Sequence, residues 1–208
     1  MGLHLDRKVS WNKGHRHWFL PAGIVVLSVL IAAIGDPARE LLRYDRASIE
    51  AGEIWRLLSG HFAHLGFTHL ALNLAGLILV WALVGSRLSS AVWMAVTAFV
   101  VAFISGSFWF LDENLTWYVG LSGLLHGLLI SGACVGLTRW RGESITLLTL
   151  VFGKIIYEQL SGPLPGSEMT SGGPVVVNAH LYGAIAGLII GSIIGLIRWR
   201  RVERDSDI

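Results

Sequence analysis

Long apolar segments separated by short polar connections dominate the chain. Each is close to the ~20 residues that a membrane-spanning helix needs. The six segments are 18–34, 67–84, 91–111, 119–137, 145–160 and 175–197. This pattern predicts an all-α membrane protein with a bundle of six transmembrane helices.

The composition agrees with a membrane protein. Hydrophobic residues make up 53% of the chain and charged residues only 14%, against about 25% charged residues in an average soluble domain. A length of 208 residues allows one domain. The first segment follows a basic stretch, as in a signal peptide, but no small-x-small cleavage site precedes Asp36, which favours a retained helix. The single cysteine, Cys134, excludes an internal disulfide and fits a small core residue.

Lysine and arginine predict the orientation, because they concentrate in cytoplasmic loops. Eleven of the sixteen basic residues lie in the N-terminal tail, the second-to-third connection, the fourth-to-fifth connection and the C-terminal tail. An N-in, C-in topology places all of them in the cytoplasm. The predicted organisation is a cytoplasmic tail (1–17), a membrane domain (18–197) and a basic cytoplasmic tail (198–208).

The first outer connection, 35–66, is long and mixes apolar with polar residues. Its stretch "ASIEAGEIWRLLSGHFAHLG" predicts a structured element at the membrane interface. Trp55 and Arg56 are of the types that anchor in the headgroup region, so we expect them to do so.

Polar residues fall at one depth on three of the predicted helices. His69 and Asn73 on the second, Ser122 on the fourth and His180 on the sixth all lie within roughly 10 Å of the outer surface at 1.5 Å per residue. A serine becomes a nucleophile when a base takes its proton, and histidine is the usual base. Asn73 and His69 are four residues apart, hence on one helix face, and both can donate to an oxyanion.

Glycines indicate how these helices meet. Gly120 and Gly123 flank Ser122, and glycines recur every four residues on the sixth helix, at 183, 187, 191 and 195. Small residues at this spacing let two membrane helices approach closely. We therefore expect the fourth and sixth helices to bring Ser122 and His180 within hydrogen-bond reach.

Four ordered motifs resemble the rhomboid family of intramembrane serine proteases. They are "WR" at 55–56, "HLALN" at 69–73, "GLSG" at 120–123 and "AHLYGAIAG" at 179–187. The resemblance covers about residues 52–195. It implies a six-helix core with a water-filled cavity open to the outer side and a Ser–His dyad with no third carboxylate. Residue by residue, it implies Ser122 as nucleophile, His180 as base, and His69 and Asn73 as oxyanion donors, with no cofactor and no metal.

Two further stretches, "GKIIYEQLSGPLPG" and "VVVNAHLYG", resemble the rhombosortase branch of that family. That resemblance implies a multi-pass protein of the bacterial inner membrane with its active site facing the periplasm. It implies a substrate anchored in the bilayer by a C-terminal transmembrane segment and cut at a Gly-Gly sorting tail. No nucleic-acid partner is expected.

Several of these residues have a second interpretation. Ser122 could hydrogen-bond to its own helix. His126 stands one turn after Ser122, so it is either a rival base or a residue that packs beneath His180. His61, His64 and His69 could bind a metal, although no carboxylate joins them and packing within the loop is the simpler expectation.

Lys154 and Glu158 lie four residues apart on the fifth predicted helix. They could form a structural ion pair or contact the substrate, since charged residues inside a membrane are functional candidates. Two other function classes compete with a protease. A catalytically inactive rhomboid-like protein would bind membrane clients but typically lacks the serine or the histidine. A transporter would show charges along several spans and inverted repeats, which are not found.

Overall fold

The computed structural model describes residues 18–206, so the predicted N-terminal tail lies outside the described residues. Ten α-helices, one short 3₁₀-helix and two two-residue strands are found in this range. They are α1 (Phe19–Ile34), α2 (Asp36–Leu42), β1 (Tyr44–Asp45), α3 (Arg46–Glu50), α4 (Arg56–Ser59), α5 (Phe67–Val84), η2 (Gly85–Arg87), α6 (Ser90–Leu111), β2 (Trp117–Tyr118), α7 (Ser122–Gly136), α8 (Arg141–Ser161), α9 (Ser167–Ser171) and α10 (Val177–Ser206).

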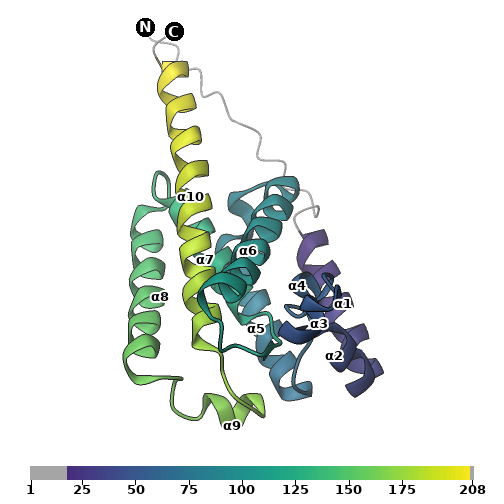
Figure 1. The fold of residues 1–208 in the computed structure, drawn as a ribbon. Helices are drawn as coiled ribbons and strands as arrows, with labels where there is room; N and C mark the ends of the chain where they lie inside the picture. The colour runs from purple at the N-terminus through teal and green to yellow at the C-terminus, as the bar shows by residue number, and fades with distance from the viewer. Residues whose placement is uncertain (1–17, 207–208) are drawn as a thin grey trace, which may run out of the picture.

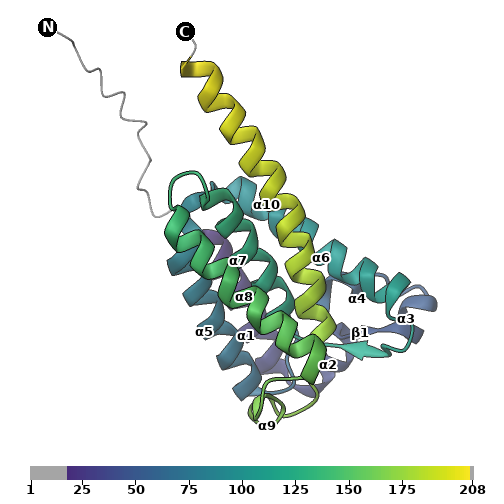
Figure 2. The same cartoon turned by 90° about the vertical axis from the view of Figure 1, so that its left-hand side faces the viewer.

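The helices form a bundle around α7 (Figures 1 and 2). α10 packs along α7 and continues well past the other helices toward the C-terminus, while α8 and α5 flank α7. The short elements α2, α3 and α4 gather beside α6, and α9 lies at the end of the bundle opposite the C-terminus. The protein is therefore mostly helical, with its most buried helix in the middle.

Three helices are long and apolar enough to cross a membrane, namely Phe67–Arg87, Ser90–Leu111 and Val177–Arg200. A fourth candidate is the pair α1 and α2, which is bent by 120°. The bend falls at Gly35, whose φ of +82° favours glycine because other residues rarely adopt it. The chain is thus a membrane protein with three or four candidate spans, and the six-span bundle stays a prediction.

Two of the six predicted spans, 119–137 and 145–160, are not among these candidates, and the physical reasons differ. α7 has 15 residues, about 22 Å, against the ~30 Å of a hydrocarbon core. Twelve of these residues are buried, so α7 is covered by protein rather than by lipid. α8 is long enough, but its mean hydropathy is lowered by its charged residues, Arg141, Glu143, Lys154 and Glu158.

The start of the fourth predicted helix differs from the expectation. The apolar pattern begins at residue 119, but the helix begins at Ser122. Tyr118 is still extended, because β2 pairs with β1 in an antiparallel register that joins Tyr118 to Tyr44. Gly120 follows with a φ of +128°, which interrupts any helix there. Ser122 is consequently the first residue of α7, where backbone N–H groups lack helical partners.

The long first connection is structured, as expected, but Arg56 is not a headgroup anchor. Its side chain is buried and donates to the carbonyl oxygens of Glu40 at 2.7 Å and Arg43 at 3.1 Å, and it also pairs with Glu53. These bonds hold α2 and α4 together. Trp55 is half exposed and donates to the carbonyl of Leu41, so it remains the candidate for the interface.

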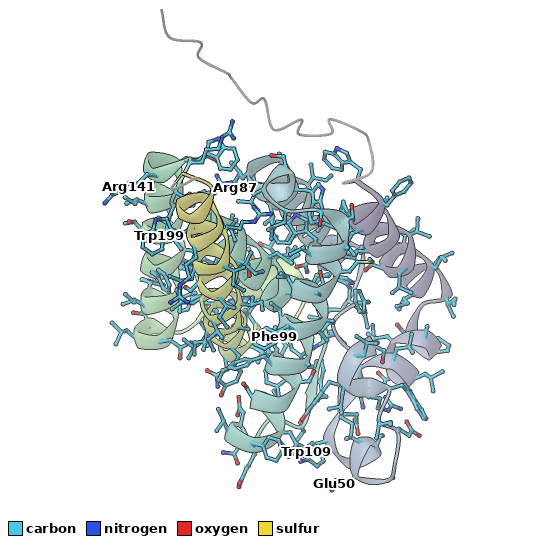
Figure 3. All side chains as sticks on the ribbon, turned by 90° about the horizontal axis from the view of Figure 1, so that it is seen from above. Glu50, Arg87, Phe99, Trp109, Arg141 and Trp199 are labelled. Carbon is cyan, nitrogen blue, oxygen red and sulfur yellow. The ribbon has the colours of Figure 1, made fainter. Side chains whose placement is uncertain are left out.

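The other end of the bundle is closed by a buried arginine. Arg87 is 2% exposed and donates to Glu143 at 2.7 Å, to Ser144 Oγ at 3.0 Å and to the carbonyl of Gly132 at 3.2 Å. Figure 3 shows Arg87 well apart from Trp109 and Glu50. The arginine thereby links the end of α5 to α7 and α8.

Candidate active site

The close packing of α7 on α10 is observed, and glycines make it possible. A Cβ at Gly123 would lie 2.8 Å from the carbonyl oxygen of Ala179. A Cβ at Gly183 or Gly187 would overlap the backbone carbonyl of Gly123 or Gly127. Two helices whose backbones touch in this way hold their facing side chains at fixed positions.

This contact brings Ser122 and His180 together. Ser122 Oγ lies 2.9 Å from His180 Nε2, although 58 residues separate them along the chain. His180 is 5% exposed. Because Ser122 is the first residue of α7, it has no preceding helical turn to bond to, so its hydroxyl is free to meet the imidazole.

His126 lies against His180 without replacing it. The two rings stack with centroids 4.4 Å apart and planes inclined by 22°. His126 Nδ1 lies 2.7 Å from the carbonyl oxygen of Ser122 and must donate to it, because a carbonyl only accepts. This bond and the stacking favour a supporting role over that of a rival base.

The expectation of a dyad with no third carboxylate is wrong for this chain. Glu158 Oε2 lies 2.9 Å from His180 Nδ1, on the side of the ring away from Ser122. Lys154 Nζ lies 2.7 Å from the same oxygen, so the two charges form an ion pair as their spacing predicted. The Glu158 side chain is 3% exposed. The carboxylate comes from the fifth predicted helix, which is why the absence of acids in the sixth predicted helix was misleading.

His69 and Asn73 flank the serine from α5. His69 Nδ1 accepts the backbone N–H of Leu65 at 3.3 Å, so in the neutral ring the proton is on Nε2. A Cβ at Gly120 would lie 3.0 Å from His69 Nε2 and 4.0 Å from Asn73 Nδ2. The glycine therefore leaves room beside two N–H donors, next to Ser122.

These residues line one cavity of about 570 Å³. Its wall includes His69, Asn73, Ser122, His126 and His180. Lys154 and Glu158 also line it, and so does the connection between α8 and α10, through Leu164, Pro165, Gly166, Thr170, Pro174 and Val176. The sequence interpretation missed this connection and Tyr118, whose hydroxyl donates to the Gly120 carbonyl at 2.5 Å. A Pro- and Gly-rich stretch beside the His180 motif was the available signal.

His61 and His64, in the first connection, are buried away from this cavity. His61 Nε2 lies 2.9 Å from Ser105 Oγ, and His64 Nδ1 lies 3.1 Å from the carbonyl of Phe62. Burial lowers the pKa of His61 to about 4, and burial together with His69 lowers the pKa of His64 to about 3. Within residues 18–206, no group of three or more His, Cys, Asp or Glu side chains is arranged to hold a metal ion.

Comparison with known proteins adds a family to this geometry. Residues 51–197 match the rhomboid domain. The chain belongs to the rhomboid family. It is 32% identical to "RHOMBOID-like protein 5" of Arabidopsis thaliana over 168 residues, which are 75% of this chain and 49% of that protein. It is also 32% identical to "RHOMBOID-like protein 2" of the same plant over 150 residues, which are 67% of this chain and 42% of that protein.

The rhomboid domain includes every residue that lines the cavity. This rhomboid chain spans about half the length, or less, of the two Arabidopsis relatives. The similarity therefore concerns the rhomboid domain and not the remaining length of the two relatives.

The prediction that His69 and Asn73 are oxyanion donors leads to a quantitative expectation for this rhomboid. His69→Ala or Asn73→Ala should lower kcat by about 100-fold, the usual loss for one oxyanion donor, and leave KM within a few-fold. The His69→Ala/Asn73→Ala protein should be slower than either. Initial rates of substrate cleavage in liposomes measure both constants. Asn114→Ala, at an exposed loop asparagine, serves as the control. An unchanged rate in the double variant would remove these residues from the site.

Proposed function

We propose that this chain is an intramembrane serine protease in which Ser122 is the nucleophile and His180 the general base. The observation that carries the proposal is the 2.9 Å approach of Ser122 Oγ to His180 Nε2 at the wall of a cavity. A serine within hydrogen-bond reach of a histidine whose other nitrogen is held by a carboxylate has the arrangement of an activated nucleophile.

The reaction follows from these positions. Ser122 Oγ attacks the substrate carbonyl carbon while His180 Nε2 takes the hydroxyl proton. His69 Nε2–H and Asn73 Nδ2–H, together with free backbone N–H groups at the start of α7, stabilise the oxyanion. His180 then passes the proton to the leaving amine. Water next attacks the acyl carbon while His180 Nε2 takes its proton, and Ser122 Oγ leaves with the proton that His180 returns.

The competing function is a rhomboid-like protein that binds membrane clients without cutting them. A fluorophosphonate probe separates the two, because it reacts with an activated serine and not with an ordinary one. Purified protein should be labelled, and peptide mapping should place the label on Ser122. Folded protein that resists the probe at every concentration would favour the binding function.

We further propose the substrate class and the location. The substrate is a protein with a single C-terminal span, cut near the outer membrane boundary at a Gly-Gly tail, as in the rhombosortase branch. The enzyme is a six-helix protein of a bacterial inner membrane, with N- and C-termini in the cytoplasm and the cavity facing the periplasm. The charge distribution in the sequence and the opposite locations of α9 and the C-terminus in the bundle (Figure 1) support the proposed orientation. The substrate class and the bacterial membrane rest on the resemblance of "GKIIYEQLSGPLPG" and "VVVNAHLYG" to the rhombosortase branch.

A glycine pair suits this cavity for a physical reason. A spanning substrate arrives as a helix, yet a protease must hold it extended, and unsatisfied backbone groups in lipid cost several kcal/mol each. Glycine disfavours helix by about 1 kcal/mol relative to alanine, so a Gly-Gly site at the wet boundary unwinds easily.

Replacing the Gly-Gly of such a substrate with Leu-Leu should therefore reduce cleavage by at least ~10-fold, from the helix propensity of two residues. The measurement is release of the outer portion into the periplasmic fraction of cells that express both proteins. A substrate with Gly-Gly moved to mid-span is the control, and it should be cut as poorly as Leu-Leu. Equal release from all three substrates would contradict selection by unwinding.

A further inference from the structure

α8 brings one acidic and one basic side chain to the imidazole of His180. Glu158 Oε2 lies 2.9 Å and Lys154 Nζ 3.3 Å from His180 Nδ1, and the two charged groups are 2.7 Å apart. Glu158 is almost fully buried, whereas Lys154 is 30% exposed. A carboxylate is costly to bury without such partners, so the pair needs a reason for being at this place.

The two side chains favour opposite tautomers of the same ring. A carboxylate only accepts, so beside Glu158 the Nδ1 of His180 carries the proton and Nε2 presents a lone pair to Ser122. An ammonium only donates, so beside Lys154 alone Nδ1 would accept and Nε2 would carry the proton. In that second form Nε2 cannot take the serine proton. The shorter contact is to Glu158, and Lys154 is itself bound to the same oxygen.

We propose that Glu158 is a positioning residue, which orients His180 and selects its productive tautomer, and that Lys154 keeps Glu158 ionised and in place. This proposal rests on the proposed function. As the Ser122 oxygen–carbon bond forms, the hydroxyl proton moves to Nε2, and the resulting imidazolium donates Nδ1–H to Glu158. The proton leaves from Nε2 to the amine as the C–N bond breaks, and Glu158 keeps its negative charge throughout.

His126 completes the support of the ring. It stacks on His180 with centroids 4.4 Å apart, while its own Nδ1 donates to the Ser122 carbonyl. Stacking on His126 thus fixes the plane of the His180 ring, and the contact with Glu158 fixes its Nδ1 edge. This assigns the ion pair to the enzyme's own base instead of to the substrate contact that the sequence suggested for Lys154 and Glu158.

Glu158→Gln is the first test, because it keeps the shape of the side chain and removes its charge. The amide can donate to Nδ1 and so favours the unproductive tautomer. In Ser–His–Asp proteases the equivalent change lowers kcat by roughly 10⁴-fold. We expect a loss of at least ~10³-fold in kcat with KM within a few-fold, and a parallel fall in the rate of fluorophosphonate labelling. Glu113→Gln, the same change at an exposed loop glutamate, is the matched control and should stay near the wild-type rate.

The probe distinguishes this role from substrate binding. Labelling requires Ser122 to lose its proton but involves no peptide substrate. A Glu158→Gln protein with a raised KM and an unchanged labelling rate would show that Glu158 contacts the substrate, and it would overturn the proposal.

Removal of Lys154 provides a second test. In Glu158→Ala the ammonium remains beside Nδ1 and favours the unproductive tautomer. Glu158→Ala/Lys154→Met removes both charged groups together, so that no unpaired charge remains beside the His180 ring. We expect the double variant to be at least ~10-fold faster than Glu158→Ala. A double variant no faster than the single one would contradict the tautomer argument.

The tautomer of His180 can also be read directly in the wild-type protein. The ¹⁵N resonances of the His180 ring, assigned by their loss in His180→Ala, report which nitrogen carries the proton. We expect the proton on Nδ1, and a ring protonated at Nε2 alone would overturn the proposal. If wild type is neither labelled nor active, the proposed function fails, while the tautomer result still stands by itself.

Discussion

Replacing Ser122 with alanine is expected to abolish cleavage and fluorophosphonate labelling while the protein remains folded in the membrane. The hydroxyl oxygen is the atom that would form the bond to the acyl group, and it lies 2.9 Å from His180 Nε2. Loss of a serine nucleophile in a well-studied protease lowers kcat by about 10⁶-fold. Time courses of substrate cleavage in liposomes, together with thermal unfolding in detergent, provide the measurement. Cleavage by Ser122→Ala near the wild-type rate would contradict the assignment.

His180→Ala should be about as damaging as Ser122→Ala, and the protein with both changes should be little worse. Groups that act as one catalytic unit are not additive, because the first loss already removes what the second group contributes. His126→Ala should be milder, since its ring supports His180 from one face. An inactive His126→Ala beside an active His180→Ala would reverse the two assignments.

Gly183→Ala is expected to lower activity by at least ~100-fold and to lower the melting temperature. A Cβ at this position would overlap the carbonyl oxygen of Gly123, so α7 and α10 would have to move apart. Ser122 and His180 come from these two helices, and a displacement of about 1 Å can cost 10²-fold in rate. Cleavage rate and thermal unfolding measure the two effects.

Gly195→Ala is the matched control, because it makes the same change in the same helix and the same four-residue repeat. The nearest atom to a Cβ at Gly195 is 3.6 Å away, an ordinary contact. Alanine is a better helix former than glycine by about 1 kcal/mol, so propensity alone predicts stabilisation at both positions. Equal behaviour of the two variants would show that close packing of these helices does not set the catalytic distance.

The helical segments could be predicted from the sequence because their apolar runs are long, but their ends could not. The apolar run begins at residue 119, but β2 pairs with β1 up to Tyr118 and Gly120 has a φ of +128°, so the helix begins only at Ser122. Arg56 was expected at the headgroups as an isolated basic residue near a tryptophan. The carbonyl groups that it contacts, those of Glu40 and Arg43, are 16 and 13 residues away along the chain, so no local sequence pattern predicts these contacts.

The family motifs, the predicted common depth of the polar residues and the four-residue glycine repeat of the sixth predicted helix can all be read from the sequence. Depth and helix face can be read in this way because they follow from the periodicity of a single helix. The tertiary structure alone decided what each face meets. Lys154 and Glu158 are recognisable as a pair from their spacing, but the partner of that pair is His180, on another helix 22 residues from Glu158. Which helix packs on which depends on how all the side chains fill the space between them, and that is not encoded in any one segment.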